Sequence, residues 1–205
     1  MSIERVITSG IFSLDGQDFE VENNIWIIGD EEVLIIDAAH DHRPIVEAVG
    51  SRTVTGILAT HGHNDHINAA VALAEVVDAP IFLHPADSML WREVYPDRAA
   101  DGELSDAMII HAGDSTLKVL HTPGHSPGGC CFYDEEHDVL FSGDTLFRGG
   151  PGATGRSFSD YATIVASIRD VLLALPSATR VLTGHGDETT IGAEAPSLPE
   201  WEAKI

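Results

Sequence analysis

Three histidines and an aspartate crowd into the stretch "ATHGHNDHINAA" at residues 59–70. With only 11 His among 205 residues, the pattern H-x-H-x-D-H is expected by chance roughly 0.003 times in the chain. Imidazoles beside a carboxylate suit a borderline-soft divalent metal such as zinc, which accepts nitrogen and oxygen ligands. A solvated polar loop is the alternative interpretation, and the rarity of the pattern favours a metal site.

Three later segments resemble this one in position, because each follows a short apolar run that predicts a strand. They are "HTPGHSPGG", "FSGDTLF" and "TGHGDETTIG", and they offer His125, Asp144 and His185 as ligands. Loops at one edge of a sheet can converge on a single site, as they often do in α/β folds. The sequence therefore predicts that these loops meet the histidine cluster.

The order H-x-H-x-D-H, T-P-G-H, G-D-T-L-F and G-H-G, from Thr60 to Gly186, resembles the metallo-β-lactamase superfamily. The resemblance implies an α/β fold of the four-layer αββα type, with two β-sheets face to face and helices outside. Within the superfamily the chain looks most like the short, single-domain glyoxalase II-like (hydroxyacylglutathione hydrolase-like) hydrolases. In these, "GHG" is followed by "TTIG", as at Thr189–Gly192 here.

The resemblance also implies a role for each ligand of a pair of divalent metal ions. The first ion would be held by His61, His63 and His125, the second by Asp65, His66 and His185, and Asp144 would bridge the two. Three neutral imidazoles leave a fourth position open for water, as in catalytic zinc sites. Zinc is the first candidate for both ions, with iron or manganese as alternatives.

The expected reaction is attack by a metal-bridging hydroxide on a carbonyl carbon, because two metals lower the pKa of bound water to roughly 7. Asp65 is the expected catalytic residue, since it would ligate the second metal and orient the hydroxide. The resemblance points to a small-molecule substrate, a thioester of a low-molecular-weight thiol.

Other functions stay open at this point. The main alternative is a persulfide dioxygenase-like oxidoreductase, with one iron on His61, His125 and Asp144, a two-histidine, one-carboxylate set typical of non-haem iron oxygenases. Hydrolysis of a β-lactam or another ester ranks lower, and a non-catalytic binding module ranks last.

Residues around the ligands carry further expectations. Asp37 ends the run "VLIID" and is a candidate partner that orients a ligand histidine, although an ordinary strand-end carboxylate is the alternative. His121 lies near His125, but the resemblance selects His125. His40 and His42 in "AAHDHRP" are interpreted as part of a solvated loop. His84, His111 and His137 are interpreted as structural or surface residues.

The stretch "FRGGPGATGRSFSD" departs from the related enzymes, which carry a lysine and a tyrosine there. Arg156 lies near the expected lysine and Phe158 near the tyrosine, so both are candidate substrate-binding residues. Asp187 replaces a further tyrosine. Arg156 could pair with a substrate carboxylate, and a solvated loop residue is the alternative.

Short apolar runs predict strands, and longer periodic runs predict helices. The expected strands are 5–11, 25–28, 33–36, 54–59, 80–83, 116–120, 129–133, 139–141 and 180–182. "YDEEHD" predicts a hairpin connection. Helices are expected over 67–77 and 160–175, the second with Ser159 as N-cap and Pro176 as its stop. The mixture indicates one α/β domain over residues 1–205. Compared with full-length glyoxalase II enzymes, which the chain resembles, we expect it to lack their C-terminal glutathione-binding helical domain.

Composition excludes several classes of protein. A net charge of −22 argues against nucleic acid as a partner, because phosphates would be repelled. The most apolar long stretch, 67–83, contains Glu75 and Asp78, so we expect no membrane span.

The two cysteines, Cys130 and Cys131, are adjacent and should face opposite sides of a strand. Without a disulfide framework or a signal-like leader, we expect a cytoplasmic protein. The oligomeric state is not indicated.

Overall fold

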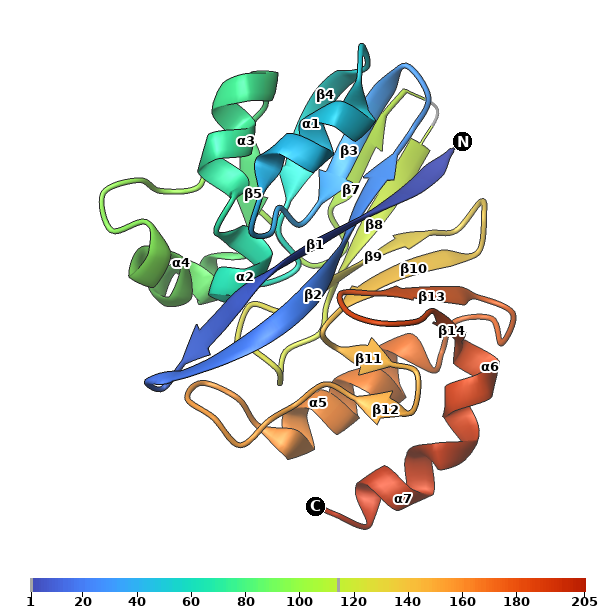
Figure 1. Cartoon of the computed structure of the whole chain (residues 1–205). Helices are drawn as coiled ribbons and strands as arrows, with labels where there is room; N and C mark the ends of the chain where they lie inside the picture. The colour runs from blue at the N-terminus through green and yellow to red at the C-terminus, as the bar shows by residue number, and fades with distance from the viewer. Residues whose placement is uncertain (1, 114) are drawn as a thin grey trace.

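The computed structural model describes residues 2–113 and 115–205. Two six-stranded sheets lie face to face, with helices packed on the outer side of each (Figure 1). The predicted four-layer αββα sandwich is therefore confirmed. Within the described residues, every helix is too short or too polar to cross a bilayer.

The first sheet has the strand order β1-β2-β3-β4-β5-β6. Its strands are β1 (Ile3–Leu14), β2 (Gln17–Ile28), β3 (Glu32–Ile36), β4 (Thr53–Leu58), β5 (Ile81–Leu83) and β6 (Gly102–Glu103). The pairs from β1 to β3 are antiparallel, and those from β3 to β6 are parallel. Parallel strands need crossover connections, and helices supply most of them here. The connections use α1 (His42–Val49), α2 (Asn64–Ile67), α3 (Ala70–Val77), η1 (Pro85–Asp87) and α4 (Ser88–Val94).

The second sheet has the order β14-β13-β10-β9-β8-β7. Its strands are β7 (Ile109–Ala112), β8 (Ser115–His121), β9 (Cys130–Asp134), β10 (Val139–Gly143), β13 (Arg180–Thr183) and β14 (Thr189–Thr190). A small ribbon pairs β11 (Leu146–Phe147) with β12 (Gly150–Pro151). The remaining helices are α5 (Tyr161–Ser167), the π-helical η2 (Ile168–Leu172), α6 (Ile191–Glu194), η3 (Ala195–Ser197) and α7 (Leu198–Glu202).

Alternation along the strands divides the buried side chains among three cores. Ile25 and Ile27 of β2 pack towards the helices of the first layer, whereas Trp26 and Ile28 pack between the two sheets. The adjacent cysteines behave as expected, with Cys130 between the sheets and Cys131 under the outer helices. Burial raises the pKa of both thiols, to about 11 for Cys131, so they are core residues rather than nucleophiles.

Two helix predictions need correction. The segment 67–77 is not one helix, because the chain between α2 and α3 bonds to the loop after β3: Ala69 N–H donates to Ala38 O at 3.0 Å. The N-cap of the later helix is Asp160 and not Ser159, since Asp160 Oδ1 accepts from Thr163 N–H at 2.7 Å. The Ser159 hydroxyl instead accepts from the backbone N–H groups of the preceding loop.

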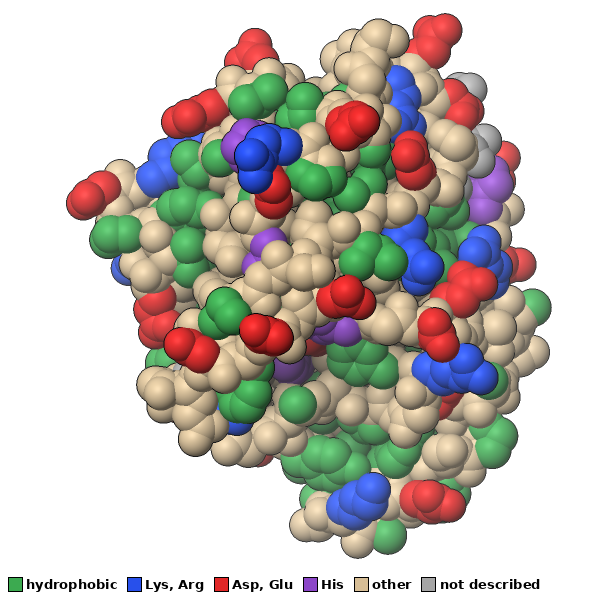
Figure 2. Space-filling model, viewed as in Figure 1, with side chains coloured by type: hydrophobic (Ala, Val, Ile, Leu, Met, Phe, Trp, Pro, Cys, Tyr) green, Lys and Arg blue, Asp and Glu red, His purple; other side chains and the backbone are tan. Residues whose placement is uncertain are grey.

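The first strand is longer than its apolar run suggests. Strands β1 and β2, of twelve residues each, form a hairpin in register from Ile3↔Ile28 to Leu14↔Gln17, which extends beyond the rest of the sheet (Figure 1). Acidic side chains are spread over the face shown in Figure 2, and histidine side chains are visible near its centre. On this face the acidic side chains are thus dispersed and do not form a single patch.

Gly124, in the turn before His125, generates the first prediction. Its φ is +135°, and a Cβ there would overlap the backbone of Ile164 at the start of α5. We expect Gly124→Ala to lower the free energy of unfolding by about 2–4 kcal/mol. Gly16 is the control, because its φ of +73° has open space around it, so Gly16→Ala should cost about 1–2 kcal/mol. Urea denaturation in a chelator would measure both, and equal losses would contradict the steric argument.

Candidate metal centre

Seven histidine and aspartate side chains converge at one edge of the sandwich. The loop after β4 carries four of them, and the loops after β8, β10 and β13 carry one each. They fall into three overlapping groups whose ligand atoms lie within 4.8 Å of one another: His61, His63 and His125; His61, His66 and Asp144; Asp65, His66 and His185. Strands β8, β10 and β13 run parallel to one another, so their carboxyl ends share one edge of the sheet.

The first group consists of three imidazoles. His63 Nδ1 lies 2.9 Å from His61 Nε2 and 3.0 Å from His125 Nε2. Nitrogens that share a tetrahedral zinc ion at 2.0–2.1 Å lie about 3.3 Å apart. The spacing of these three nitrogens therefore suits one metal ion.

Bonds on the outer nitrogens fix the ring tautomers. His125 Nδ1–H donates to Ala153 O at 2.8 Å. Thr60 Oγ1 donates to Asp37 Oδ2 at 2.9 Å, so it accepts from His61 Nδ1–H at 3.0 Å. In both rings the Nε2 lone pair is left facing the centre, which is the arrangement that a metal ligand requires.

The second group is built in the same way. His66 Nε2 lies 3.2 Å from His185 Nε2 and 3.5 Å from Asp65 Oδ2, and the other nitrogens donate outward. His66 Nδ1–H bonds to Asp37 Oδ2 at 2.8 Å, and His185 Nδ1–H bonds to Glu22 O at 2.6 Å. Asp37 is thus placed where it orients His66 directly and His61 through Thr60.

Asp144 lies between the two groups. Its Oδ2 is 3.6 Å from His125 Nε2 and 3.5 Å from His185 Nε2, while its Oδ1 is 3.4 Å from His66 Nε2. One carboxylate therefore reaches ligands of both groups, which is the placement that a bridging ligand needs.

The charges and orphaned atoms of the centre fit divalent cations. Among the described residues, the buried Oδ1 atoms of Asp65 and Asp144 and the Nε2 atom of His63 have no hydrogen-bond partner. Unpartnered buried carboxylate oxygens are costly, and coordination of a metal satisfies them.

The pKa shifts of the two groups have opposite signs. Burial, with the neighbouring His125, lowers the pKa of His63 to about 3, so the His63 ring is neutral and ready to ligate. Burial also acts to lower the pKa of His185, but Asp144 and Asp65 outweigh it and raise that pKa to about 10. Positive charge on His66 and His185 in turn holds the pKa of Asp144 well below its usual value, against the effect of burial. The Asp65 and Asp144 carboxylates are thus stabilised by neighbouring positive charge, which a divalent ion can supply.

Asp87, at the end of η1, is a residue that the sequence did not reveal. Its buried carboxylate accepts from Gly62 N–H at 2.8 Å, Ser126 Oγ–H at 2.7 Å and Gly128 N–H at 2.5 Å. It therefore ties the loop of His61 and His63 to the loop of His125. A Cβ on Gly128 would collide with Asp87, and a Cβ on Gly62 would collide with Leu90 and crowd Asp87, so the glycines permit this approach. No local motif marks the residue, because its partners are 25 to 41 positions away.

The expected substrate-binding residues lie apart from each other. A small cavity of about 40 Å³ beside the first group is lined by Phe12, His63, His125, Ala153, Arg156, Ser157 and Ser159. Arg156 lies over the ring of Phe19, with Cζ 4.9 Å from its centroid, and donates to Gln17 Oε1 at 3.1 Å. Phe158 is 52% exposed, has a φ of +66° and is not among the lining residues.

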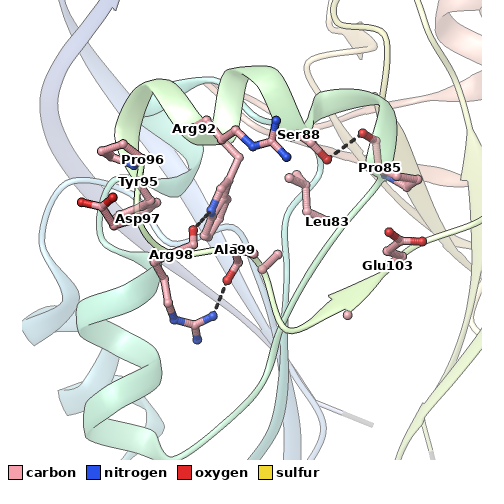
Figure 3. A pocket seen from close by; sticks show the side chains of 13 residues that line it. Leu83, Pro85, Ser88, Arg92, Tyr95, Pro96, Asp97, Arg98, Ala99 and Glu103 are labelled. Atoms are coloured by element: carbon pink, nitrogen blue, oxygen red, sulfur yellow. Dashed lines mark hydrogen bonds between the residues drawn. The ribbon is translucent and has the colours of Figure 1, made fainter.

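A larger hollow lies elsewhere. A cavity of about 420 Å³ is lined largely by α4 and the chain leading from it to β6 (Figure 3). Its wall is braced by Trp91 Nε1–H, which donates to Arg98 O. None of the seven ligand residues lines this cavity, and its lining contains no histidine.

Comparisons with known proteins agree with this geometry. The family model described as "Metallo-beta-lactamase superfamily" matches residues 18–185. Hydroxyacylglutathione hydrolase GloC of Haemophilus influenzae is 32% identical over 200 residues, covering 89% of this chain and 94% of that protein. The solved structure of BLEG-1 B3 metallo-beta-lactamase is 30% identical with a TM-score of 0.80, covering 95% of this chain and 99% of that one. TTHA1623, solved in a di-iron-bound form, is 34% identical with a TM-score of 0.75, covering 85% and 93% respectively.

Two nearby histidines provide a test of the ligand assignment. His125→Ala should remove a metal ligand and reduce turnover by more than about 100-fold. Mutation of a residue that only hydrogen-bonds to a metal ligand already lowers metal affinity or activity by about 10- to 100-fold. His121→Ala is the control, since His121 stacks on His84 at 4.1 Å and can donate through Nε2 to Pro127 O at 3.0 Å. Metal content per chain and hydrolysis rates should be measured together. Equal losses in the two variants would refute the assignment.

Proposed function

Because this chain belongs to the metallo-beta-lactamase superfamily, we propose that it is a metal-dependent hydrolase that binds two ions and cleaves thioesters. The observation that carries the proposal is the completeness of both ligand groups, with Asp144 between them. The likeness to a hydroxyacylglutathione hydrolase supports a thioester of a low-molecular-weight thiol as the substrate. Zinc remains the first candidate metal, with iron and manganese as alternatives.

The ligand side chains divide the work of holding the ions. His61, His63 and His125 would hold the first ion, Asp65, His66 and His185 the second, and Asp144 both. When bound, two such ions polarise a carbonyl and bring the pKa of a water molecule to about 7. The imidazoles of His66, His125 and His185 are held in the tautomer that metal binding requires. Their Nδ1–H groups donate to Asp37, Ala153 O and Glu22 O, respectively.

The chain's own residues account for the remaining steps. Asp65 Oδ1 has no hydrogen-bond partner among the described residues, so it can accept a hydrogen bond from the attacking water and orient it. No protein nucleophile is needed, and the two cysteines are buried in the cores. Water adds its oxygen to the acyl carbon and the carbon–sulfur bond breaks. A thiol with a pKa of about 8.5 leaves readily as the thiolate.

Access to the centre involves the β1–β2 hairpin. A cavity of about 40 Å³ is smaller than an acyl-thiol, and the hairpin tip closes it against the loop that carries Arg156. Ser157 Oγ–H donates to Asp15 Oδ1 at 2.8 Å across this contact. We propose that the tip and the loop separate to admit the substrate, and that the Arg156 guanidinium then pairs with a substrate carboxylate.

The central prediction concerns metal stoichiometry and reaction. Protein purified without added metal should contain close to two ions per chain and hydrolyse low-molecular-weight thioesters. Asp65→Asn should reduce both occupancy of the second ion and turnover, the latter by about 100-fold or more. Elemental analysis would measure the number and kind of ions, and assays with a thioester, a persulfide and a β-lactam would identify the reaction. One iron per chain, with oxygen consumption on a persulfide, would instead establish the dioxygenase alternative.

A separate prediction concerns the thiol carrier. Arg156 is the cation at the cavity, whereas Asp187 adds an anion where related enzymes have tyrosine, which disfavours the carboxylates of glutathione. We expect weak activity on lactoylglutathione and better activity on another low-molecular-weight thioester. Arg156→Ala should raise KM about tenfold or more. Arg169→Ala is the matched control, because Arg169 pairs with the exposed Asp170 at 2.7 Å and contacts no ligand or cavity residue. Efficient lactoylglutathione hydrolysis, unchanged by Arg156→Ala, would contradict this prediction.

A further inference from the structure

Asn23, on β2, has a side chain that faces the second ligand group. The residue is fully buried, and its Nδ2 lies 3.2 Å from Asp65 Oδ2. The same nitrogen is 3.3 Å from His66 Nε2 and 3.4 Å from His185 Nε2. Every member of the group is therefore within reach of one amide, although no sequence motif includes Asn23.

A chain of hydrogen bonds fixes which end of this amide faces the ligands. The backbone N–H of His40 donates to Asn68 Oδ1 at 2.5 Å, so Asn68 Nδ2–H faces His40 Nδ1 at 3.3 Å. His40 Nδ1 is consequently the acceptor, and the proton of the neutral ring lies on Nε2. His40 Nε2–H then donates to Asn23 Oδ1 at 2.9 Å. The N–H end of Asn23 is left to donate to Asp65.

The hydrogen-bonded chain of Asn68, His40 and Asn23 requires an unusual backbone conformation and a close contact with a glycine. His40 adopts a φ of +61°, which is unusual for a residue with a side chain. Gly10, on β1, lies against the His40 ring, and a Cβ at that position would overlap it. Burial lowers the pKa of His40, which agrees with a neutral ring. His40 is thus not the solvated loop residue that the sequence suggested.

We propose that Asn23 is a positioning residue for the second metal ion, held in place by His40 and Asn68. Its N–H bond to Asp65 Oδ2 fixes the carboxylate among the ligand nitrogens, where the same oxygen lies 3.5 Å from His66 Nε2 and 3.3 Å from His185 Nε2. Without this bond, Asp65 would have to be ordered when the ion binds, and the affinity for the ion would fall. The inference rests on the dinuclear site proposed above.

The test measures binding of zinc alone, by chelator competition, in wild-type protein and variants. Asn23→Ala and His40→Leu should weaken the second zinc by about 10- to 100-fold and leave the first unchanged. His40→Gln should recover part of the loss, because its amide N–H can replace Nε2–H. Thr8→Val is the matched control: Thr8 pairs with Asn23 across the strands and donates to Ala39 O at 2.9 Å, without touching a ligand.

The possible outcomes separate the two proposals. Two zinc ions in the wild type, with the second weakened in Asn23→Ala and His40→Leu but not in Thr8→Val, would support the inference. Two ions bound equally well by wild type and Asn23→Ala, or equal weakening of both ions, would refute the inference alone. A single ion in the wild type would refute the dinuclear site, and the role of Asn23 in it would fall too. Thermal unfolding of the metal-free variants would separate general destabilisation from loss of affinity.

Discussion

Two carboxylates, the buried Asp65 and the largely buried Asp144, lie within a few ångströms of five imidazoles and form the constraint on which the rest of this structure depends. Buried charge must be balanced, and here the free lone pairs and orphaned oxygens converge on positions suited to cations. The protein secures that convergence from outside, because outer acceptors hold the donor nitrogens of four of the five ligand imidazoles, those of His61, His66, His125 and His185. The site is thereby organised by hydrogen bonds within the fold, which reduces the ordering that metal binding must bring about.

The sandwich provides this organisation through its edges. Strands β8, β10 and β13 run parallel and deliver one ligand each, while β4 of the other sheet delivers the remaining four. Loops from two sheets must then be kept in register with each other. Asp87 does this for the first group, because its buried carboxylate accepts hydrogen bonds from both loops. Asp37 holds Thr60 and His66 within the first sheet, and His185 of the second sheet is held against β2 by its bond to Glu22 O. Glycine is required where these loops meet such carboxylates closely, as at Gly62 and Gly128.

The sequence predicted what depends on local pattern. Alternating and continuous apolar runs indicated most of the strands of the two sheets, and the four motifs indicated the seven side chains that the structure brings together. Contacts between distant segments could not be predicted in this way. The partners of Asp87 lie 25 to 41 positions away, those of Asn23 lie 17 to 162 positions away, and neither residue lies in a motif. The break between α2 and α3 has the same origin, since it is set by backbone bonds to the loop after β3.

The β1–β2 hairpin connects the ligands with the entrance to the site. Its base is buried from Asn23 to Ile28, whereas from Gln17 to Glu20 near its tip the residues of β2 are exposed. Segments with few buried contacts open at low free-energy cost, and well-buried segments do not. The tip can therefore separate from the loop of Arg156 and Ser157 while the base keeps Asn23 against Asp65. Substrate admission and ligand positioning thus lie on one pair of strands, and the gradient of burial along it keeps the two functions independent.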